Sequence, residues 1–382
     1  MKSKRIRALL LAGAALMGMT IGGCGNKIND NAVFATLDDT TITMGVANFF
    51  AKYQQAVYDS YYLSYFGDDM WNNDIYGNGN TLTQDVKTEV AENLQKMYLL
   101  KAHMEEYDVS ISEEEEAAMV KAADDFIAAN SKAAIRQIGA ENKENVVEML
   151  RLNTIQKKMH DRIIQDADTE VTDEEAAQRT FSYLYMDSTG YTDDESNHVD
   201  YTEEEKADLK ATAESIAKAE NFDTAVTDAG YTLSTLSYGS AEDEDATMDK
   251  AVLEAADKLK EGEVSDVIET DSAYYVVRLD SEHDEEATAS KKEELISEKE
   301  ENYYNDILDG WVEESSWKIN EDEWAKVTFE DHFTPPAADE TETPEEAAGT
   351  ETTEDTAATE EPQEETTPEA PQEDTEAAEE TE

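Results

Sequence analysis

Apolar residues recur through the first half of the chain at the spacing of helices. Within 85–107 they fall at intervals of three and four residues, which is the period of an amphipathic helix. The members of this series are Val86, Val90, Leu94, Met97, Leu100 and Met104. Similar spacing predicts helices at 44–63, 113–130 and 143–165, and Ser112 followed by Glu115 forms a capping box before the second of these. Two short strands within 33–43 and a loop rich in Gly, Asn and Asp at 64–84 complete the predicted helical half.

The pattern changes after residue 172, where short β-prone runs alternate with helices. A second capping box, Thr172 with Glu175, predicts a short helix that ends near Arg179. Residues 181–186 alternate as a strand, and 202–219 reads as a capped helix. Residues 250–279 predict a helix, Gly262 as its left-handed C-cap, and two strands, 264–270 and 273–279, around a polar corner. A long helix at 290–314 follows, and Trp311, Trp317 and Trp324 close the ordered part.

Composition narrows the class of protein. The chain has 382 residues, enough for about two domains, and its 30 basic and 92 acidic side chains give a formal charge of −62. Nucleic acid is therefore excluded as a partner, because phosphate binding requires clustered Lys and Arg. All six prolines lie at or after Pro335, and 335–382 holds 19 acidic residues without Lys or Arg. Such a segment buries too little apolar surface to fold, so a disordered acidic tail is predicted at 334–382.

The N-terminus has the pattern of a secretory signal. A basic start is followed by a short apolar run, then by Ile21-Gly22-Gly23 and the only cysteine, Cys24. This order resembles a bacterial lipoprotein signal, which implies that Cys24 is lipidated and becomes the new N-terminus. Two acyl chains on that cysteine are enough for stable anchoring to a membrane. The alternative is an ordinary secretion signal with an incidental cysteine.

Residues 250–279 also resemble the end of a parvulin-type peptidyl-prolyl isomerase domain. In that family a helix ending in Gly-Glu-(Val/Ile)-Ser leads to a strand and then to a Gly-Tyr-His strand. Here Gly262-Glu-Val-Ser265 matches, and Ala273-Tyr274-Tyr275 stands where Gly-Tyr-His occurs. The hairpin and first helix resemble the start of the helical chaperone domain of secreted foldases of the SurA and PrsA type. The resemblance covers about 33–329.

The resemblance implies an α+β chain: a helical SurA-N-like chaperone domain with an inserted parvulin-like α/β domain and a C-terminal helix that returns to the first domain. The implied boundaries are 1–23 for the signal peptide, 24–31 for the anchor linker, 32–175 for the chaperone domain, 176–285 for the parvulin-like (PpiC) domain, 286–333 for the returning segment and 334–382 for the tail. In a chaperone domain, some Met and aromatic side chains line a surface for unfolded chains. The sequence does not identify which ones.

The resemblance also implies a site, whose residues transfer one by one. The family uses two His, on the first and last strands, with a Cys or Asp between them, and a proline pocket of Met and Phe. The pocket positions fall on Met248 and Val252, and the His positions on Ser182 and Tyr275. The Cys or Asp position has no counterpart that can be assigned within 231–239. The proline pocket is thus half kept and the polar network is replaced, while His198 and His283 occupy no family position.

These observations predict a membrane-anchored, extracytoplasmic foldase or chaperone for newly secreted, unfolded polypeptides, with weak or absent isomerase activity. An active peptidyl-prolyl isomerase with a changed polar set is the first alternative. A solute-binding lipoprotein of a transporter is the second, although it calls for repeated βαβ units that the helix-rich first half lacks. No metal or cofactor is expected, because the chain has no zinc spacing, no phosphate-binding Gly-rich loop and no nucleophile elbow.

Overall fold

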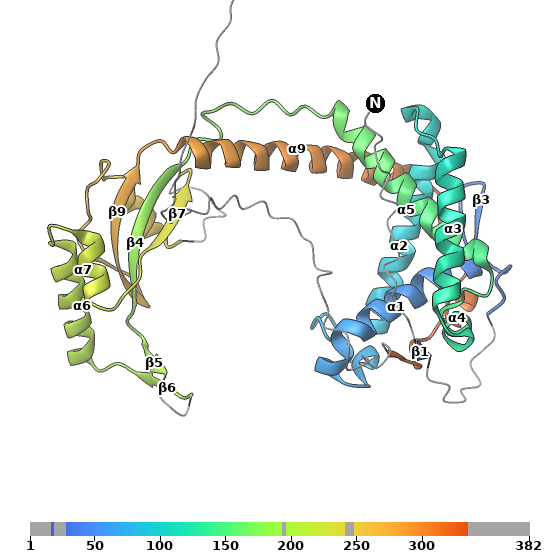
Figure 1. Ribbon diagram of the computed structural model, residues 1–382, viewed down its shortest axis with the longest axis horizontal. Helices are drawn as coiled ribbons and strands as arrows, with labels where there is room; N and C mark the ends of the chain where they lie inside the picture. The colour runs from blue at the N-terminus through green and yellow to red at the C-terminus, as the bar shows by residue number, and fades with distance from the viewer. Residues whose placement is uncertain (1–16, 19–27, 193–195, 241–247, 335–382) are drawn as a thin grey trace, which may run out of the picture. The chain divides into compact units, whose positions relative to one another are not determined.

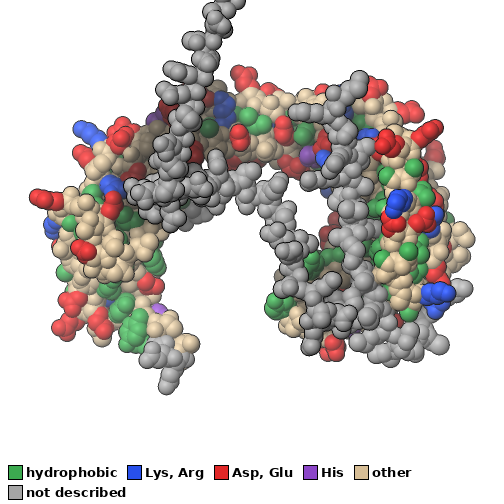
Figure 2. All heavy atoms as spheres, in the orientation of Figure 1, with side chains coloured by type: hydrophobic (Ala, Val, Ile, Leu, Met, Phe, Trp, Pro, Cys, Tyr) green, Lys and Arg blue, Asp and Glu red, His purple; other side chains and the backbone are tan. Residues whose placement is uncertain are grey.

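The structure, a computed structural model, describes residues 17–18, 28–192, 196–240 and 248–334. The fold is α+β, with a helical part and a four-stranded antiparallel sheet (Figure 1). Cys24 and the acidic tail from residue 335 lie outside the described residues. The predicted signal peptide also lies outside the described residues, apart from β1 (Met17–Gly18). This strand pairs with β11 (Phe333–Thr334). Acidic side chains are spread over the face shown in Figure 2.

The helical part begins with the predicted hairpin and continues through five α-helices. The hairpin is β2 (Val33–Leu37) and β3 (Thr40–Thr43), and the helices are α1 (Met44–Phe66), α2 (Leu82–Ala102), α3 (Glu113–Ala129), α4 (Lys132–Ile138) and α5 (Lys143–Ile163). Three short 3-10 turns, η1 (Met70–Asn72), η2 (Met104–Tyr107) and η3 (Ile164–Asp166), lie between or after them. The Ser112–Glu115 capping box starts α3 as predicted. The sequence reading missed α4, which is only two turns long.

The helical core is formed by the apolar stripes read from the sequence. Val86, Leu94 and Leu100 of α2 are each at most 1 % exposed, and Phe49 of α1 is fully buried. Helices α1, α2 and α5 pack on one another, and α3 packs on α5. Among the described residues, no helix has the length and apolarity needed to cross a membrane.

The sheet has the strand order β7-β4-β9-β8, in which every neighbouring pair is antiparallel. Its strands are β4 (Arg179–Asp187), β7 (Ser234–Tyr238), β8 (Ile268–Glu269) and β9 (Ala273–Ser281). Helices α6 (Glu203–Ala217) and α7 (Phe222–Asp228) pack on one face, and α8 (Lys250–Ala256) packs on the other. A separate hairpin, β5 (Gly190–Thr192) with β6 (His198–Asp200), follows β4.

Three local predictions differ from the structure. The strand predicted at 264–270 pairs with β9 only at Ile268–Glu269, apart from one isolated bridge between Val264 and Arg278. The Thr172–Glu175 capping box is formed, but it closes only a turn, because the chain from Arg179 onward pairs with β7 and β9. Gly262 has the predicted left-handed φ of 82°, yet α8 ends at Ala256, so Gly262 is not its cap. Instead the Gly262 N–H donates to the Leu279 carbonyl at 2.7 Å, which aligns the chain beside β9.

The segment after the sheet returns to the helical part, which confirms that prediction. It comprises α9 (Glu285–Glu314), β10 (Trp317–Ile319) and α10 (Glu321–Trp324). Near its start α9 is tied to the sheet, because Thr288 Oγ accepts from the Gln178 N–H at 3.0 Å. Near its end Tyr304 and Leu308 are buried against α2 and α5, and β10 then pairs antiparallel with β2.

Candidate substrate-binding face of the sheet

The β4 strand has buried residues on both faces of the sheet. Because side chains alternate along a strand, Phe181, Tyr183 and Tyr185 lie on one face. Phe181 and Tyr183 pack in the core that includes Val252 of α8. Leu184 and Met186 lie in the other core, under α6 and α7. The face on which a residue lies therefore decides which neighbours it can meet.

Three tyrosines gather on the α8 face, and we call them the tyrosine cluster: Tyr183, Tyr185 and Tyr275. Tyr185 and Tyr275 are directly opposed across the β4–β9 pair, with ring centroids 5.4 Å apart. The ring of Tyr183 lies 6.2 Å from that of Tyr275. Tyr185 is 44 % exposed, so the cluster opens to solvent at this side.

Met248 and Val252 lie on the same face but play different parts. Met248 is partly buried and packs against the same core as Tyr275 and Ile268. Val252 is 0 % exposed beneath α8, so it supports the face and has no surface to offer a ligand. The structure thus brings Met248 and Tyr275 to one surface, with Val252 below it.

Ser182 lies on the opposite face and does not join these residues. Its hydroxyl donates to Asp280 at 2.5 Å. Arg278 bonds the same carboxylate at 2.7 Å and reaches Asp223 of α7 at 2.5 Å. Ser182 is thus part of a polar link between the sheet and α7. The first-strand residues that face Tyr275 are Tyr183 and Tyr185, one and three positions further along.

The tyrosine cluster supplies neutral hydroxyl groups. Burial, together with the neighbouring Tyr185, Tyr183 and Asp249, raises the pKa of Tyr275 above its ordinary value. Burial and Asp187 raise the pKa of Tyr185 in the same way. Both phenols therefore stay protonated at neutral pH and are able to donate hydrogen bonds.

No histidine of the described part of the sheet faces the tyrosine cluster. His198 lies on β6, 56 % exposed at the side chain, with its Nε2 3.2 Å from Asp200. His283 follows β9 and is exposed. Nowhere in the described ranges do three or more His, Cys, Asp or Glu side chains come together as a metal site would require. The face can grip apolar and aromatic groups and donate from phenols, and no histidine lies on it among the residues that the structure describes.

Comparison with known families identifies the sheet. Residues 185–304 match the family described as the PPIC-type PPIase domain. The sheet therefore belongs to a PPIC-type domain. The matched part of the PPIC-type domain begins within β4 and extends into α9.

Solved structures of foldases resemble the chain at low identity. The foldase protein PrsA from Lactococcus lactis is 15 % identical, over 78 % of this chain and 98 % of that one, with a TM-score of 0.35. PrsA from Streptococcus pneumoniae is 18 % identical, over 67 % and 98 %, with a TM-score of 0.29. A structure reported with the SurA-like chaperones PEB4 and Cj1289 of Campylobacter jejuni is 13 % identical, over 76 % and 99 %, with a TM-score of 0.27. No curated protein matches the sequence.

Sequence reasoning missed two members of the tyrosine cluster. The alternation of 181–186 predicts a strand, and the spacing of Tyr183 and Tyr185 from Phe181 is the signal that places three aromatic rings on one of its faces. The sequence also does not identify which aromatic residues of the helical part are exposed. The structure answers that at the end of α1, where Tyr61, Tyr65 and Phe66 are 67 %, 83 % and 49 % exposed.

Proposed function

We propose that the protein is a membrane-anchored, extracytoplasmic foldase that binds unfolded polypeptides, with weak or absent peptidyl-prolyl isomerase activity. The observation that carries the proposal is a PPIC-type domain whose α8 face presents Met248 and the tyrosine cluster, with no histidine among the described residues of that face. The helical part would hold extended clients, and the PPIC-type domain would bind their prolyl segments.

The chemistry of rotation about the prolyl peptide bond explains how the domain can bind prolyl segments and still catalyse their isomerisation weakly or not at all. The barrier to rotation about a peptide C–N bond is about 18–20 kcal/mol, and catalysis requires polar groups that favour the twisted amide over the planar one. Apolar contacts with Met248 and with the faces of the tyrosine rings do not distinguish the planar from the twisted amide, so these contacts give affinity without acceleration. The Ser182 hydroxyl, bonded to Asp280 on the other face, cannot reach a peptide held by Met248.

A second function, an active isomerase, is favoured by one observation. The hydroxyl-bearing rings of Tyr183 and Tyr185 both lie beside Tyr275, so more than one phenol can donate to a bound amide. A solute-binding role has no such support, because every neighbouring pair of strands in the described part of the chain is antiparallel and builds no βαβ unit.

The chaperone activity is tested by the aggregation of a chemically unfolded client. We expect the full chain to suppress light scattering at equimolar amounts, and bovine serum albumin at the same concentration serves as the control. Scattering that is unchanged at a several-fold excess of the full chain would contradict the proposal.

Anchoring through Cys24 is tested by cell fractionation. We expect the wild-type protein in the membrane fraction and a Cys24→Ser variant in the soluble extracytoplasmic fraction, because the variant has no thiol to carry acyl chains. A variant that stays with the membrane after high-salt washing would show that another feature holds the protein there.

A further inference from the structure

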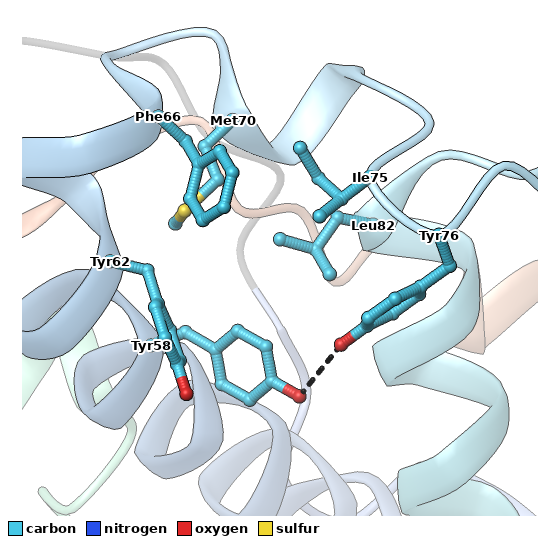
Figure 3. A pocket seen from close by; sticks show the side chains of 7 residues that line it. All are labelled: Tyr58, Tyr62, Phe66, Met70, Ile75, Tyr76 and Leu82. Carbon is cyan, nitrogen blue, oxygen red and sulfur yellow. Dashed lines mark hydrogen bonds between the residues drawn. The ribbon is translucent and has the colours of Figure 1, made fainter. Parts of the chain in front are cut away.

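An open pocket lies in the helical part. Its volume is about 190 Å³, and it is lined by Tyr58, Tyr62, Phe66, Met70, Ile75, Tyr76 and Leu82 (Figure 3). Tyr58, Tyr62 and Phe66 are four residues apart on α1, so they share one side of that helix. In Figure 3, Ile75, Tyr76 and Leu82 lie across the pocket from Phe66 and Tyr62. All seven side chains are apolar or aromatic, which is the lining that grips an apolar side chain.

The end of α1 and the pocket beside it hold most of the exposed aromatic side chains that the structure describes. Eight large hydrophobic side chains are strongly exposed in the described ranges, and three of them, Tyr62, Phe66 and Tyr76, line this pocket. Two more, Tyr61 and Tyr65, lie on the same turns of α1, and the ring of Tyr61 is 6.4 Å from that of Tyr62. A concentrated apolar patch of this kind marks an interaction surface, whereas scattered exposed residues do not.

The base of the pocket is held firmly. Met70 is 0 % and Leu82 2 % exposed, so the floor belongs to the helical core. The neighbouring Trp71 donates its Nε1–H to Asp59 at 2.8 Å and packs on Phe329 of the returning segment, with ring centroids 4.5 Å apart. A pocket that exists before binding loses little entropy when it is filled.

The charge around the pocket selects the kind of occupant. Residues 58–85 contain five Asp and no Lys, Arg or His. Asp68, Asp69 and Asp74 are exposed, whereas Asp59 is buried and already has partners that include His332. Lys87, the next cation along the chain, already donates to the carbonyls of Trp324 and Val327. The negative charge of Glu89 is also felt at the pocket, since it adds to burial in raising the pKa of Tyr58. The chain's own acidic tail and a second copy of this acidic protein would both be repelled.

We infer that this pocket, which we call the aromatic pocket, binds segments of unfolded polypeptide in which an aliphatic or aromatic side chain lies next to Lys or Arg. The apolar side chain enters between Phe66 and Leu82, and the neighbouring cation meets the acidic surroundings. This rests on the proposed foldase function and specifies its client.

The test measures the binding of three short fluorescent peptides to the full chain by anisotropy. The first alternates Lys with Leu and Phe, the second replaces the apolar residues by Ser, and the third replaces Lys by Glu. We expect the first peptide to bind at least about ten-fold more tightly than either of the others, as buried aromatic anchors and complementary charge together provide.

Matched variants locate the site. Tyr62→Ser combined with Phe66→Ser changes two half-exposed side chains, and we expect it to weaken binding of the first peptide about ten-fold. Tyr191→Ser is the control, because Tyr191 is 47 % exposed on the β5–β6 hairpin, and it should leave binding unchanged. Phe66→Leu keeps an apolar wall and should restore most of the affinity, which separates loss of the pocket from misfolding.

The outcomes separate this inference from the proposed function. Equal affinity of the Tyr62→Ser, Phe66→Ser variant and the wild type would overturn the aromatic pocket while aggregation suppression by the wild type still stood. Equal binding of the Lys and Glu peptides would overturn the preference for cations. If the wild type suppresses no aggregation yet binds the first peptide through Phe66, the foldase function fails and the aromatic pocket remains a peptide site.

Discussion

The carboxylate of Asp59 holds the returning C-terminal segment against α1, and its removal gives the sharpest test of the helical part. Asp59 is 3 % exposed. It accepts from the Trp71 Nε1–H and from the Phe333 N–H, each at 2.8 Å. The Nδ1 of His332 lies 3.2 Å from the same carboxylate, and Gln55 donates to it at 3.4 Å. One buried side chain thus satisfies donors from its own helix α1, from η1 and from the distant C-terminal segment.

The cost of Asp59→Ala follows from the donors that it would leave buried. A hydrogen bond to a charged group contributes about 1.5–3 kcal/mol net, and a buried donor left unsatisfied costs about 1–3 kcal/mol. Two short bonds and two longer ones are lost, and such terms do not add fully. We therefore expect the free energy of unfolding of the helical part to fall by about 3–5 kcal/mol.

Tryptophan fluorescence isolates this part of the molecule. All four tryptophans, Trp71, Trp311, Trp317 and Trp324, lie in the helical part or the returning segment. If the free energy of unfolding falls by about 3 kcal/mol per molar urea, Asp59→Ala should lower the midpoint of urea unfolding by about 1–2 M. The control, Asp161→Ala, removes an exposed partner of Lys157 and should change stability by less than about 0.5 kcal/mol. A loss below about 1 kcal/mol for Asp59→Ala would refute the assigned role of this carboxylate.

Three further predictions concern the PPIC-type domain and α3. Met248→Ala should weaken binding of a proline-containing peptide to the full chain about ten-fold, as measured by anisotropy. Ser182→Ala should leave this binding unchanged and lower the free energy of unfolding by about 1 kcal/mol, because its hydrogen bond to Asp280 is lost. If Ser182→Ala weakens binding and Met248→Ala does not, Ser182 belongs to the binding site. Peptide affinity should be constant between pH 6 and 8, because the raised pKa of Tyr275 keeps its hydroxyl protonated throughout, and a transition near pH 6.5 would point to a histidine instead. The bonds from Arg151 hold the pKa of Glu116 below its ordinary value, so they stabilise the fold above the unfolded pKa of about 4.3, and this stability is lost as pH falls through the folded pKa. Glu116→Gln should therefore be less stable than wild type at pH 7 in urea titrations, and the difference should disappear as pH falls through the folded pKa of Glu116. A difference that persists after this carboxylate is protonated would contradict the role of the charge.

Local signals predicted the helical part well. The capping box of Ser112 with Glu115 and the apolar stripe of 85–107 both appear where the sequence places them. These features depend on neighbours within a few residues, so periodicity captures them. The return of the chain to the first domain was implied by the family resemblance and is confirmed by the pairing of β10 with β2.

The site was harder to predict because β4 is buried on both faces. Apolar and aromatic residues occupy both phases of its alternation, so the pattern gives no preference between Ser182 and Tyr183 as the partner of Tyr275. A shift of one residue moves the whole side chain to the other face, which is what separates Ser182 from the tyrosine cluster. Similarly, the Thr172–Glu175 capping box predicts a helix from neighbouring residues alone. Only a turn forms there, because the chain from Arg179 pairs in the sheet.

Prolyl isomerisation by the full chain tests the central claim most directly. The assay follows the cis–trans relaxation of a proline tetrapeptide with wild type and Met248→Ala at matched concentrations. The account holds that the phenols of the tyrosine cluster are not preorganised for the twisted amide, and a missing preorganised donor removes a contribution of about 10²–10³ in rate. We therefore predict acceleration of no more than about ten-fold over the uncatalysed reaction, together with measurable peptide binding. Rapid turnover that Met248→Ala abolishes would contradict the claim and establish the PPIC-type domain as a working isomerase.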